Sequence, residues 1–347
     1  MKNFEEYFKI CNENILIKKN KFTKSEKPKI SVITPVYNKA KTLQRYQRSI
    51  QNQPFFNLEI IFIDDQSKDD SIKVIEELQK EDERIILIKN KQRKGTLISR
   101  NLGVLKSKGE YLMFVDPDDM ISKSILRYSY KLSKKYDYDL IRFNIYIGNY
   151  EFNLPEVVNF LGDEPIVKPN IHLYLFYGLG KLLQLDYYVT NKLIKKKLFI
   201  KALNSINKYY LNQFMVDCED GMINFMLYKL SESLFFTRRI GYYYIKTNKS
   251  ITFISGDFKK RLKSNFLYFR FIFQSTKNNN IEKSIANYIF HEVNYYHPDI
   301  VNILRNISED FNLYKKTINL FLNNDFIQLK SKKILKNMNK AIHDLKI

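Results

Sequence analysis

The first 120 residues alternate between two hydrophobic patterns. Short and almost uninterrupted apolar runs occur at 30–34, 58–63, 84–88 and 111–115, which is typical of buried β-strands. Between them, apolar side chains recur every three or four positions, as at Leu43, Tyr46 and Ile50, and this spacing predicts amphipathic helices at 39–51, around 72–78 and at 96–105. Strands that alternate with helices predict an α/β fold with a doubly wound, largely parallel sheet.

Polar side chains follow three of these predicted strands directly. They are Tyr37 and Asn38 after the first strand, Asp64 and Asp65 after the second, and Asp116 and Asp118 after the fourth. The carboxyl ends of parallel strands meet at one edge of a sheet, where ligands bind in open α/β folds. Crowded carboxylates repel one another and favour a bound cation, and Mg²⁺ or Mn²⁺ suits oxygen ligands. The ordinary alternative is a solvated acidic turn.

The turn after the first strand excludes two common nucleotide-binding folds. Residues 35–40 contain no glycine, whereas a dinucleotide fold needs glycines there so that the backbone can approach a pyrophosphate. A P-loop needs Gly-Lys-Ser/Thr, and the run from Arg93 to Thr96 has the lysine before the glycine. Neither of these two types of nucleotide site is therefore expected at this edge.

The chain is strongly basic, with 58 Lys and Arg, 37 Asp and Glu, and a formal net charge of +21. This balance raises the possibility of a basic nucleic-acid-binding protein. However, residues 251–347 carry a net charge of +8, close to their share by length, so the charge is spread rather than gathered in one arm. We therefore expect no nucleic acid partner, although a basic surface could attract nucleotides or an anionic membrane face.

Cysteine usage and the N-terminal sequence predict a soluble, cytoplasmic protein. Cys11 and Cys218 are the two cysteines, too few for a disulfide framework, which fits a reducing compartment. Residues 1–10 carry charges throughout and lack the apolar core of a signal peptide. The sequence contains no run of about 18 apolar residues, so it predicts no membrane span.

Four short motifs give the chain a family resemblance. They are Pro35-Val36-Tyr37-Asn38, Asp64-Asp65-Gln66-Ser67, Ser99-Arg100-Asn101-Leu102-Gly103, and Gly109-Glu110-Tyr111 followed by Asp116-Pro117-Asp118-Asp119. In this order and spacing, residues 30–120 resemble the family 2 glycosyltransferases of the GT-A fold. Gln66 stands where glycine is usual in that family, and Ser99 where alanine is usual.

The resemblance implies a role for each matching residue. Pro35 and Tyr37 match the uracil pocket, Asp65 matches the carboxylate that accepts from the base, and Arg100 and, more loosely, Lys94 match positions near the diphosphate. Asp116 and Asp118 match the pair at the metal site, with Asp116 also on the ribose side. The resemblance therefore implies a UDP-sugar donor and Mn²⁺ or Mg²⁺ as the cofactor, whereas Asp119 could simply cap the following turn.

The second half of the chain offers two further candidate groups. Asn191 and Lys192 resemble a segment that lies near the sugar or the acceptor in relatives, and a plain surface turn is the alternative. Glu219 and Asp220 resemble the family's Glu-Asp pair at a helix start, where free N–H groups hold a carboxylate ionised. We expect Asp220 to accept the acceptor hydroxyl's proton in an inverting transfer, with Glu219 as the second choice and an N-cap pair as the alternative.

These patterns predict a lead-in at 1–28, a GT-A domain at 29–255 and a helical C-terminal region at 256–347. A strand at 139–147 and an irregular excursion over the site at 149–169 are expected inside the domain. The aromatic cluster at 266–273 is expected to pack on the transferase domain as a helix, and a homo-oligomer or a peripheral membrane contact through 256–347 is the alternative.

The leading hypothesis is an inverting, metal-assisted glycosyltransferase. It would move a hexose or N-acetylhexosamine from a UDP-sugar to a glycan, lipid-linked or protein-linked acceptor. A catalytically inactive GT-A-like protein that binds sugars or scaffolds an assembly is the alternative, and the presence of Asp116, Asp118 and Asp220 argues against it.

Overall fold

The computed structural model describes residues 24–149, 156–158, 164–167, 188–215 and 219–246, and five single positions between 264 and 275. The described residues within Met1–Ile171, Tyr188–Phe214 and Met226–Ile254 form one compact unit, and those within His172–Tyr187, Met215–Phe225 and Ser255–Ile347 form a second. Most of the lead-in predicted at 1–28 and most of 256–347 lie outside the described residues, so the predicted domain boundaries remain predictions.

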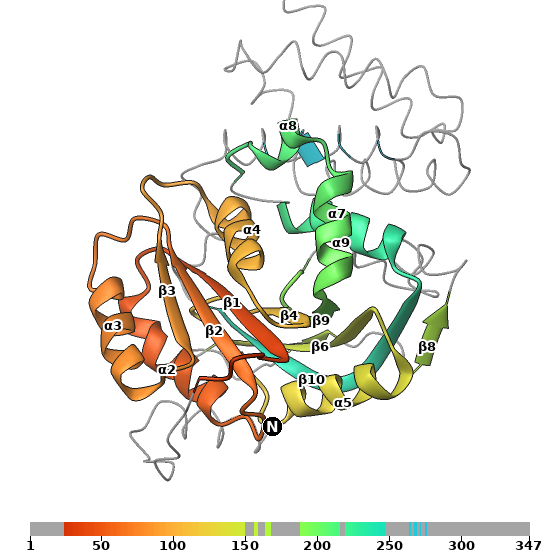
Figure 1. Ribbon diagram of the computed structural model, residues 1–347, viewed down its shortest axis with the longest axis horizontal. Helices are drawn as coiled ribbons and strands as arrows, with labels where there is room; N and C mark the ends of the chain where they lie inside the picture. The colour runs from red at the N-terminus through yellow and green to blue at the C-terminus, as the bar shows by residue number, and fades with distance from the viewer. Residues whose placement is uncertain are drawn as a thin grey trace, which may run out of the picture. The chain divides into compact units, whose positions relative to one another are not determined.

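Within the described residues, the first unit is built on a sheet of ten strands (Figure 1). Eight of them follow the order β3-β2-β1-β4-β9-β6-β10-β5, and the other two, β7 and β8, pair with β6 and β10. The strands are β1 (Ile30–Val36), β2 (Leu58–Asp64), β3 (Ile85–Lys89), β4 (Tyr111–Phe114), β5 (Met120–Ile121), β6 (Leu140–Asn149), β7 (Glu156–Val158), β8 (Glu164–Val167), β9 (Lys192–Lys195) and β10 (Ser233–Lys246). β1, β2, β3 and β4 run parallel, as predicted.

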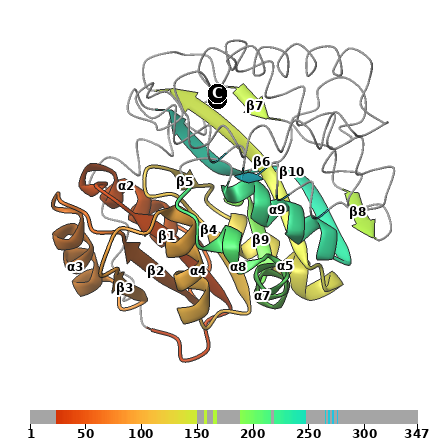
Figure 2. The same ribbon diagram turned by 90° about the horizontal axis from the view of Figure 1, so that it is seen from above.

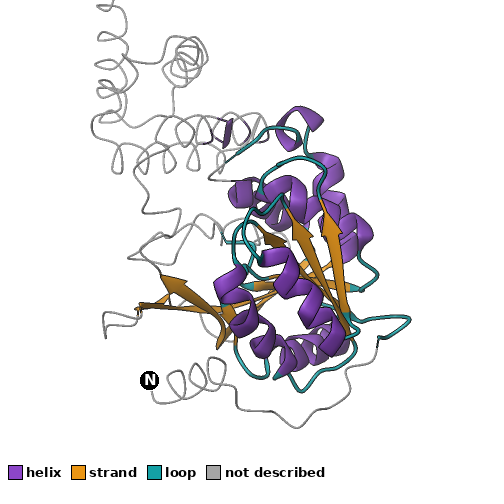
Figure 3. Cartoon of the chain, turned by 90° about the vertical axis from the view of Figure 1, so that its left-hand side faces the viewer, coloured by secondary structure: helices purple, strands orange, loops and turns teal. Residues whose placement is uncertain are grey.

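Helices connect these strands and cover both faces of the parallel part of the sheet (Figures 1 and 3). They are α2 (Ala40–Gln51), α3 (Ser71–Glu81), α4 (Thr96–Lys106), α5 (Ile125–Tyr136), α7 (Lys196–Ser205) and α8 (Lys208–Leu211), followed by α9 (Glu219–Leu230). The predicted stripe of α2, Leu43, Tyr46 and Ile50, is fully buried. Each strand and helix predicted between residues 30 and 120 is therefore present, with bounds within three positions.

Successive side chains of a strand point to opposite faces of the sheet, so neighbouring residues pack against different layers of helices. Val32 and Phe62 belong to the core that includes the apolar stripe of α2. Their neighbours Ile33 and Ile63 point to the other face, where their side chains meet Gly103 of α4. Because both faces are covered, β2 is buried along its whole length, and this explains why its residues are apolar apart from Glu59 and the terminal Asp64.

The second half turns the sheet from parallel to mixed. β9 runs antiparallel to both β4 and β6, and it joins the first four strands to β6, β10 and β5 (Figure 2). β7 and β8 come from the segment expected to be an irregular excursion, and both pair antiparallel with the sheet. That expectation was wrong for these two short stretches, whose β-branched residues favour strands. The predicted doubly wound mixed sheet flanked by helices is confirmed.

The second unit contains the first turns of α9. The ring of Phe225 lies 6.0 Å from that of Phe271, and Tyr268 packs on Gly221, where an added Cβ would come within 2.9 Å of its ring. Tyr268 and Phe271 belong to the aromatic cluster predicted at 266–273, and both are buried. The cluster's other aromatic residues lie outside the described part of the chain.

Gly109 allows β4 to start against the backbone of β1, and this generates a stability prediction. A Cβ at Gly109 would lie 2.5 Å from the Ser31 nitrogen and 2.9 Å from the Ile30 carbonyl carbon, and backbone atoms cannot rotate away. We expect Gly109→Ala to lower the free energy of unfolding by about 2 kcal/mol, as overpacking does. Urea unfolding of this variant beside Lys108→Ala, an exposed neighbour, measures the effect. Equal stability of the two variants would contradict the steric argument.

Candidate functional site

Two turns at the carboxyl ends of β1 and β2 interlock. Asn38 accepts a hydrogen bond from the Lys68 nitrogen at 2.7 Å and donates its own N–H to Ser67 Oγ at 3.0 Å. The Lys39 nitrogen donates to Ser71 Oγ at 2.8 Å, and the Asp65 nitrogen donates to the Val36 carbonyl at 2.8 Å. These bonds hold the Pro-Val-Tyr-Asn and Asp-Asp-Gln-Ser motifs in a fixed relation.

Asp65 joins this pair of turns to the start of α4. Its Oδ1 accepts from Asn90 Nδ2 and from the Lys94 nitrogen, both at 2.8 Å, and its Oδ2 accepts from the Gly95 nitrogen at 2.8 Å. Lys94 therefore contacts Asp65 through its backbone nitrogen. Asn90 also donates to Ser99 Oγ at 3.0 Å, so the serine that replaces the usual alanine takes part in the same network.

Left-handed backbone conformations shape both turns. Gln66 has φ 64° and Asn38 has φ 55°, a region that costs most residues about 1 kcal/mol. Gln66 occupies the position where glycine is usual in the resembling family, and glycine adopts this region without strain. Local bonds offset the cost here, because the Gln66 amide donates to the Lys91 carbonyl at 2.6 Å and its backbone nitrogen donates to Asp64 at 3.1 Å.

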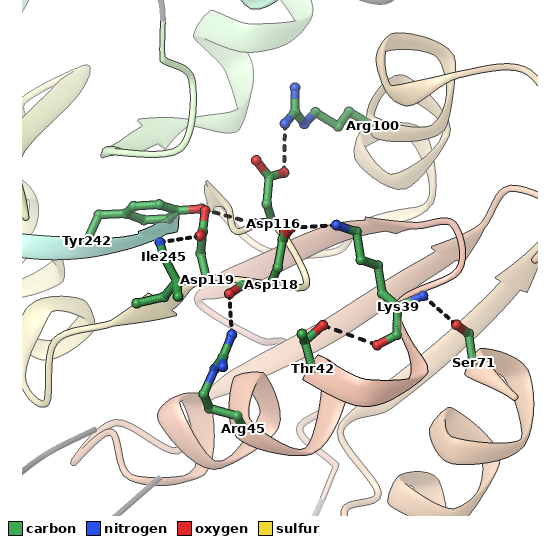
Figure 4. Close-up of polar contacts among 10 residues, drawn as sticks. All are labelled: Lys39, Thr42, Arg45, Ser71, Arg100, Asp116, Asp118, Asp119, Tyr242 and Ile245. Atoms are coloured by element: carbon green, nitrogen blue, oxygen red, sulfur yellow. Dashed lines mark hydrogen bonds and ion pairs between the residues drawn. The ribbon is translucent and has the colours of Figure 1, made fainter. Parts of the chain in front are cut away.

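The acidic turn after β4 is surrounded by cations (Figure 4). Arg100 of α4 donates to Asp116 Oδ1 at 2.8 Å, and Lys39 Nζ lies 2.5 Å from Asp118 Oδ2. Arg45 of α2 donates to the Asp118 carbonyl oxygen at 2.6 Å. Helices from both faces of the sheet therefore deliver positive charge to one short acidic loop.

Asp119 points away from these cations and into the protein. Its Oδ2 accepts from the Tyr242 hydroxyl at 2.7 Å, and its Oδ1 accepts from the Ile245 nitrogen at 2.9 Å. Burial, and then the nearby charges of Asp118 and Asp116, raise the pKa of Asp119 well above its usual value. Burial and Asp119 likewise raise the pKa of Tyr242. Asp119 bonds to β10 and not to the following turn, so the reading of it as a simple cap was wrong.

Lys39 is the cation that the acidic turn perturbs most clearly. Partial burial lowers its pKa, but the attraction of Asp118, together with that of Asp116 and Asp119, outweighs this and raises the pKa above the usual value. Lys39 is therefore charged at neutral pH, and its ammonium lies at the carboxylate predicted to hold a metal ion.

Asp116 and Asp118 retain the chemistry that a hard divalent ion requires. Within the described residues, each ion pair uses only one carboxylate oxygen, Oδ1 of Asp116 and Oδ2 of Asp118. The described part of the chain contains no group of three or more His, Cys, Asp and Glu side chains that could enclose a metal. The two carboxylates fit an ion that takes its remaining ligands from water or from phosphate oxygens.

Tyr37 lies at the same rim with a partner that the sequence did not suggest. The guanidinium carbon of Arg93 lies 3.9 Å from the centre of the Tyr37 ring and 5.9 Å from that of Phe214. Tyr37 and its motif neighbour Pro35 are half-buried, whereas Arg93 is exposed. Stacking of a cation on this ring shows that the face of Tyr37 accepts a flat, delocalised group.

Asn191 and Lys192 are fully buried, so the surface-turn reading was wrong. Lys192 begins β9, and its ammonium bonds to Asn191 Oδ1 at 2.6 Å and to the Tyr188 carbonyl. Asn191 Nδ2 donates to the Phe143 carbonyl at 3.3 Å. Their assignment to a sugar or acceptor pocket remains a prediction.

Glu219 and Asp220 open α9, as the Glu-Asp motif predicted, and both are half-buried in its first turn. They belong to the second unit, whereas the rim residues belong to the first. The roles predicted for Pro35, Tyr37, Asp65, Lys94, Arg100, Asp116 and Asp118 remain predictions, although the structure brings these residues to one rim. Sequence reasoning did not name Lys39, Arg45, Arg93 or Tyr242 as site residues. The available signals were that Lys39 directly follows the first motif and that Tyr242 stands in a run of three tyrosines, 242–244.

Within the described residues, no helix has the length and apolar character needed to cross a bilayer.

The sequence is 31% identical to glycosyltransferase GlyA of Streptococcus pneumoniae over 62% of this chain and 30% of that protein. It is 29% identical to glycosyltransferase GlyG of the same organism over 64% of this chain and 72% of that protein.

Solved structures give the same picture of the fold. A crystal structure of S. aureus TarS 1–349 in complex with UDP-GlcNAc matches with a TM-score of 0.69 and 15% identity, covering 91% of this chain and 89% of that one. The model of the glycosyl transferase family 2 matches residues 31–203, which include the strands that carry the acidic rim. The chain thus has a GT-A type fold and belongs to glycosyltransferase family 2.

Proposed function

We propose that this protein transfers a hexose or N-acetylhexosamine from a UDP-sugar to a glycan, lipid-linked or protein-linked acceptor, with inversion and with Mn²⁺ or Mg²⁺. The observation that carries the proposal is the acidic turn after β4, where Asp116 and Asp118 stand among Arg100, Lys39 and Arg45. Carboxylates that hold a cation, beside further cations, form a site for a diphosphate.

The base of the donor would bind between Tyr37 and Asp65. The Tyr37 ring already carries a stacked guanidinium, which a uracil ring could replace or face across the pocket. Oδ2 of Asp65 accepts one described hydrogen bond, whereas Oδ1 accepts two, and each carboxylate oxygen has two lone pairs. Oδ2 is therefore the atom available to accept the N–H of the base.

Charge stabilisation would help the sugar–phosphate bond to break. A bound divalent ion stabilises the negative charge that develops on the departing UDP. Arg100 and Lys39 of this chain would add positive charge on either side of the same phosphates. Asp220, or Glu219 beside it, would accept the proton of the acceptor hydroxyl as its oxygen attacks C1 of the sugar.

The relatives suggest the class of donor. TarS was solved with UDP-GlcNAc. A 42% identical stretch of 100 residues matches a GalNAc(5)-diNAcBac-PP-undecaprenol beta-1,3-glucosyltransferase of Campylobacter jejuni, over 28% of this chain and 32% of that enzyme. A poly(ribitol-phosphate) beta-glucosyltransferase of Bacillus spizizenii is 35% identical over 115 residues, 18% of its length. These names favour glucose or N-acetylglucosamine donors and a lipid-linked or polymeric acceptor.

A panel of UDP-sugars with Mn²⁺, scored for release of UDP, tests this function. We expect one donor class to be used and the release to stop when EDTA removes the metal. Asp118→Asn should lower the rate by about 100-fold or more, because the amide is a weaker metal ligand and carries no charge. Asp70→Asn, at an exposed carboxylate, is the matched control. Full activity of Asp118→Asn would exclude this metal assignment.

Lys39 generates a separate prediction about metal affinity. Its ammonium and a divalent ion compete for the Asp118 carboxylate, and the two like charges repel. We expect Lys39→Met to bind Mn²⁺ in the absence of nucleotide about fivefold more tightly, the scale of a partly exposed ion pair. Mn²⁺ titration followed by electron paramagnetic resonance measures this, with Lys41→Met as the exposed control. Weaker Mn²⁺ binding by Lys39→Met would show that the ammonium and the metal do not compete.

A further inference from the structure

Tyr242 connects the acidic turn to a strand more than 120 positions away in the sequence. Its hydroxyl accepts the N–H of Asp116 at 3.1 Å and donates to Asp119 Oδ2 at 2.7 Å (Figure 4). The Ile245 nitrogen, three residues further along β10, donates to Asp119 Oδ1 at 2.9 Å. Three hydrogen bonds from one strand thus hold both ends of the turn that contains Asp118.

The register of β10 explains why the hydroxyl reaches this position. β10 pairs antiparallel with β5, with Tyr242 opposite Ile121 and Tyr243 opposite Met120. β5 follows Asp119 directly, so the same pairing that completes the sheet brings Tyr242 beside the turn. Asp119 and Tyr242 are each 1% exposed, and two buried polar groups of this kind are costly unless they bond to each other.

The ring and the hydroxyl of Tyr242 have separable roles. The ring belongs to the apolar core of the sheet, and a phenylalanine would fill that space equally well. Both described hydrogen bonds of the hydroxyl go to the acidic turn. A role limited to core packing therefore does not explain the hydroxyl.

We infer that Tyr242 is a positioning residue, which sets the geometry of Asp116 and Asp118 through the buried carboxyl of Asp119. The inference rests on the proposed function, because it assigns Tyr242 to the site for metal and diphosphate. A metal site needs its ligands held within about half an ångström. The turn is closed by the bond from the Asp119 nitrogen to the Asp116 carbonyl at 3.0 Å, so an anchored Asp119 limits rotation of the whole loop.

Binding of UDP with Mn²⁺ to the full chain, measured by calorimetry, tests the inference without turnover. We expect Tyr242→Phe to bind UDP about fivefold to tenfold more weakly in the presence of Mn²⁺, the effect of one or two lost hydrogen bonds. Tyr243→Phe, the adjacent tyrosine whose ring packs on Tyr146, should bind as the wild type does. Asp119→Asn, which keeps one acceptor oxygen, should show an intermediate loss and serves if Tyr242→Phe does not fold.

Hydrogen exchange separates this inference from the function it rests on. Without any ligand, the amides of Asp116, Asp118 and Asp119 should exchange faster in Tyr242→Phe than in Tyr243→Phe, since the Asp116 N–H has lost its acceptor. Equal UDP affinity of the two variants, with the wild type binding, would overturn the positioning role alone. A wild type that binds no UDP with Mn²⁺ would overturn the proposed function, and the positioning role with it.

Discussion

Three carboxylates within four residues at the end of β4 are the constraint on which the rest of the site depends. Mutual repulsion would open such a turn unless each negative charge were compensated. The structure compensates Asp116 with Arg100 and Asp118 with Lys39. Asp119 is instead buried, which raises its pKa, and it accepts hydrogen bonds from Tyr242 and from the Ile245 nitrogen. Two ion pairs and one buried acid thus allow the carboxylates to remain close together.

This arrangement explains why the rim turns are cross-linked so heavily. Lys39 reaches Asp118 from the start of α2, where its backbone nitrogen bonds to Ser71 and its carbonyl accepts from Thr42 (Figure 4). Arg100 reaches Asp116 from α4, whose first residues are held by Asp65. The hydrogen bonds of the first two motifs therefore help to determine where Lys39 and Arg100 lie beside the acids of the fourth motif. The electrostatic balance of the acidic turn is a product of the whole parallel sheet.

The first half of the fold could be predicted because its signals are local. Strand β2 consists of the predicted run 58–63 and one further residue, Asp64. Asp64 pairs with Lys89 of β3, and its side chain accepts a hydrogen bond from the Gln66 nitrogen in the next turn. The spacing of Leu43, Tyr46 and Ile50 predicted the buried face of α2, because this signal is also local. The carboxyl-end rule placed the predicted polar groups at one rim, since parallel strands force that result.

The pairings within the site could not be predicted, because they join distant positions. Lys39 meets Asp118 across 79 positions and Tyr242 meets Asp119 across 123. A sequence pattern gives the type of a side chain and not its partner. Asn191 and Lys192 illustrate the opposite difficulty. A surface turn was the alternative interpretation of these polar residues, yet both are fully buried, which is rare for a lysine.

The hydrogen bonds that Asp119 accepts from β10 make the site depend on the second half of the chain as well. The four motifs that mark the rim all precede residue 120. The sequence was expected to add Asn191, Lys192, Glu219 and Asp220 from the second half, but no support for the acidic turn. However, β10 supplies the Tyr242 hydroxyl and the Ile245 nitrogen that satisfy the buried acid. Without β10, Asp119 would be buried without these donors or would turn outward to join two repelling neighbours. Either outcome would disturb the carboxylates of the turn, so the first 120 residues are not sufficient to form the site.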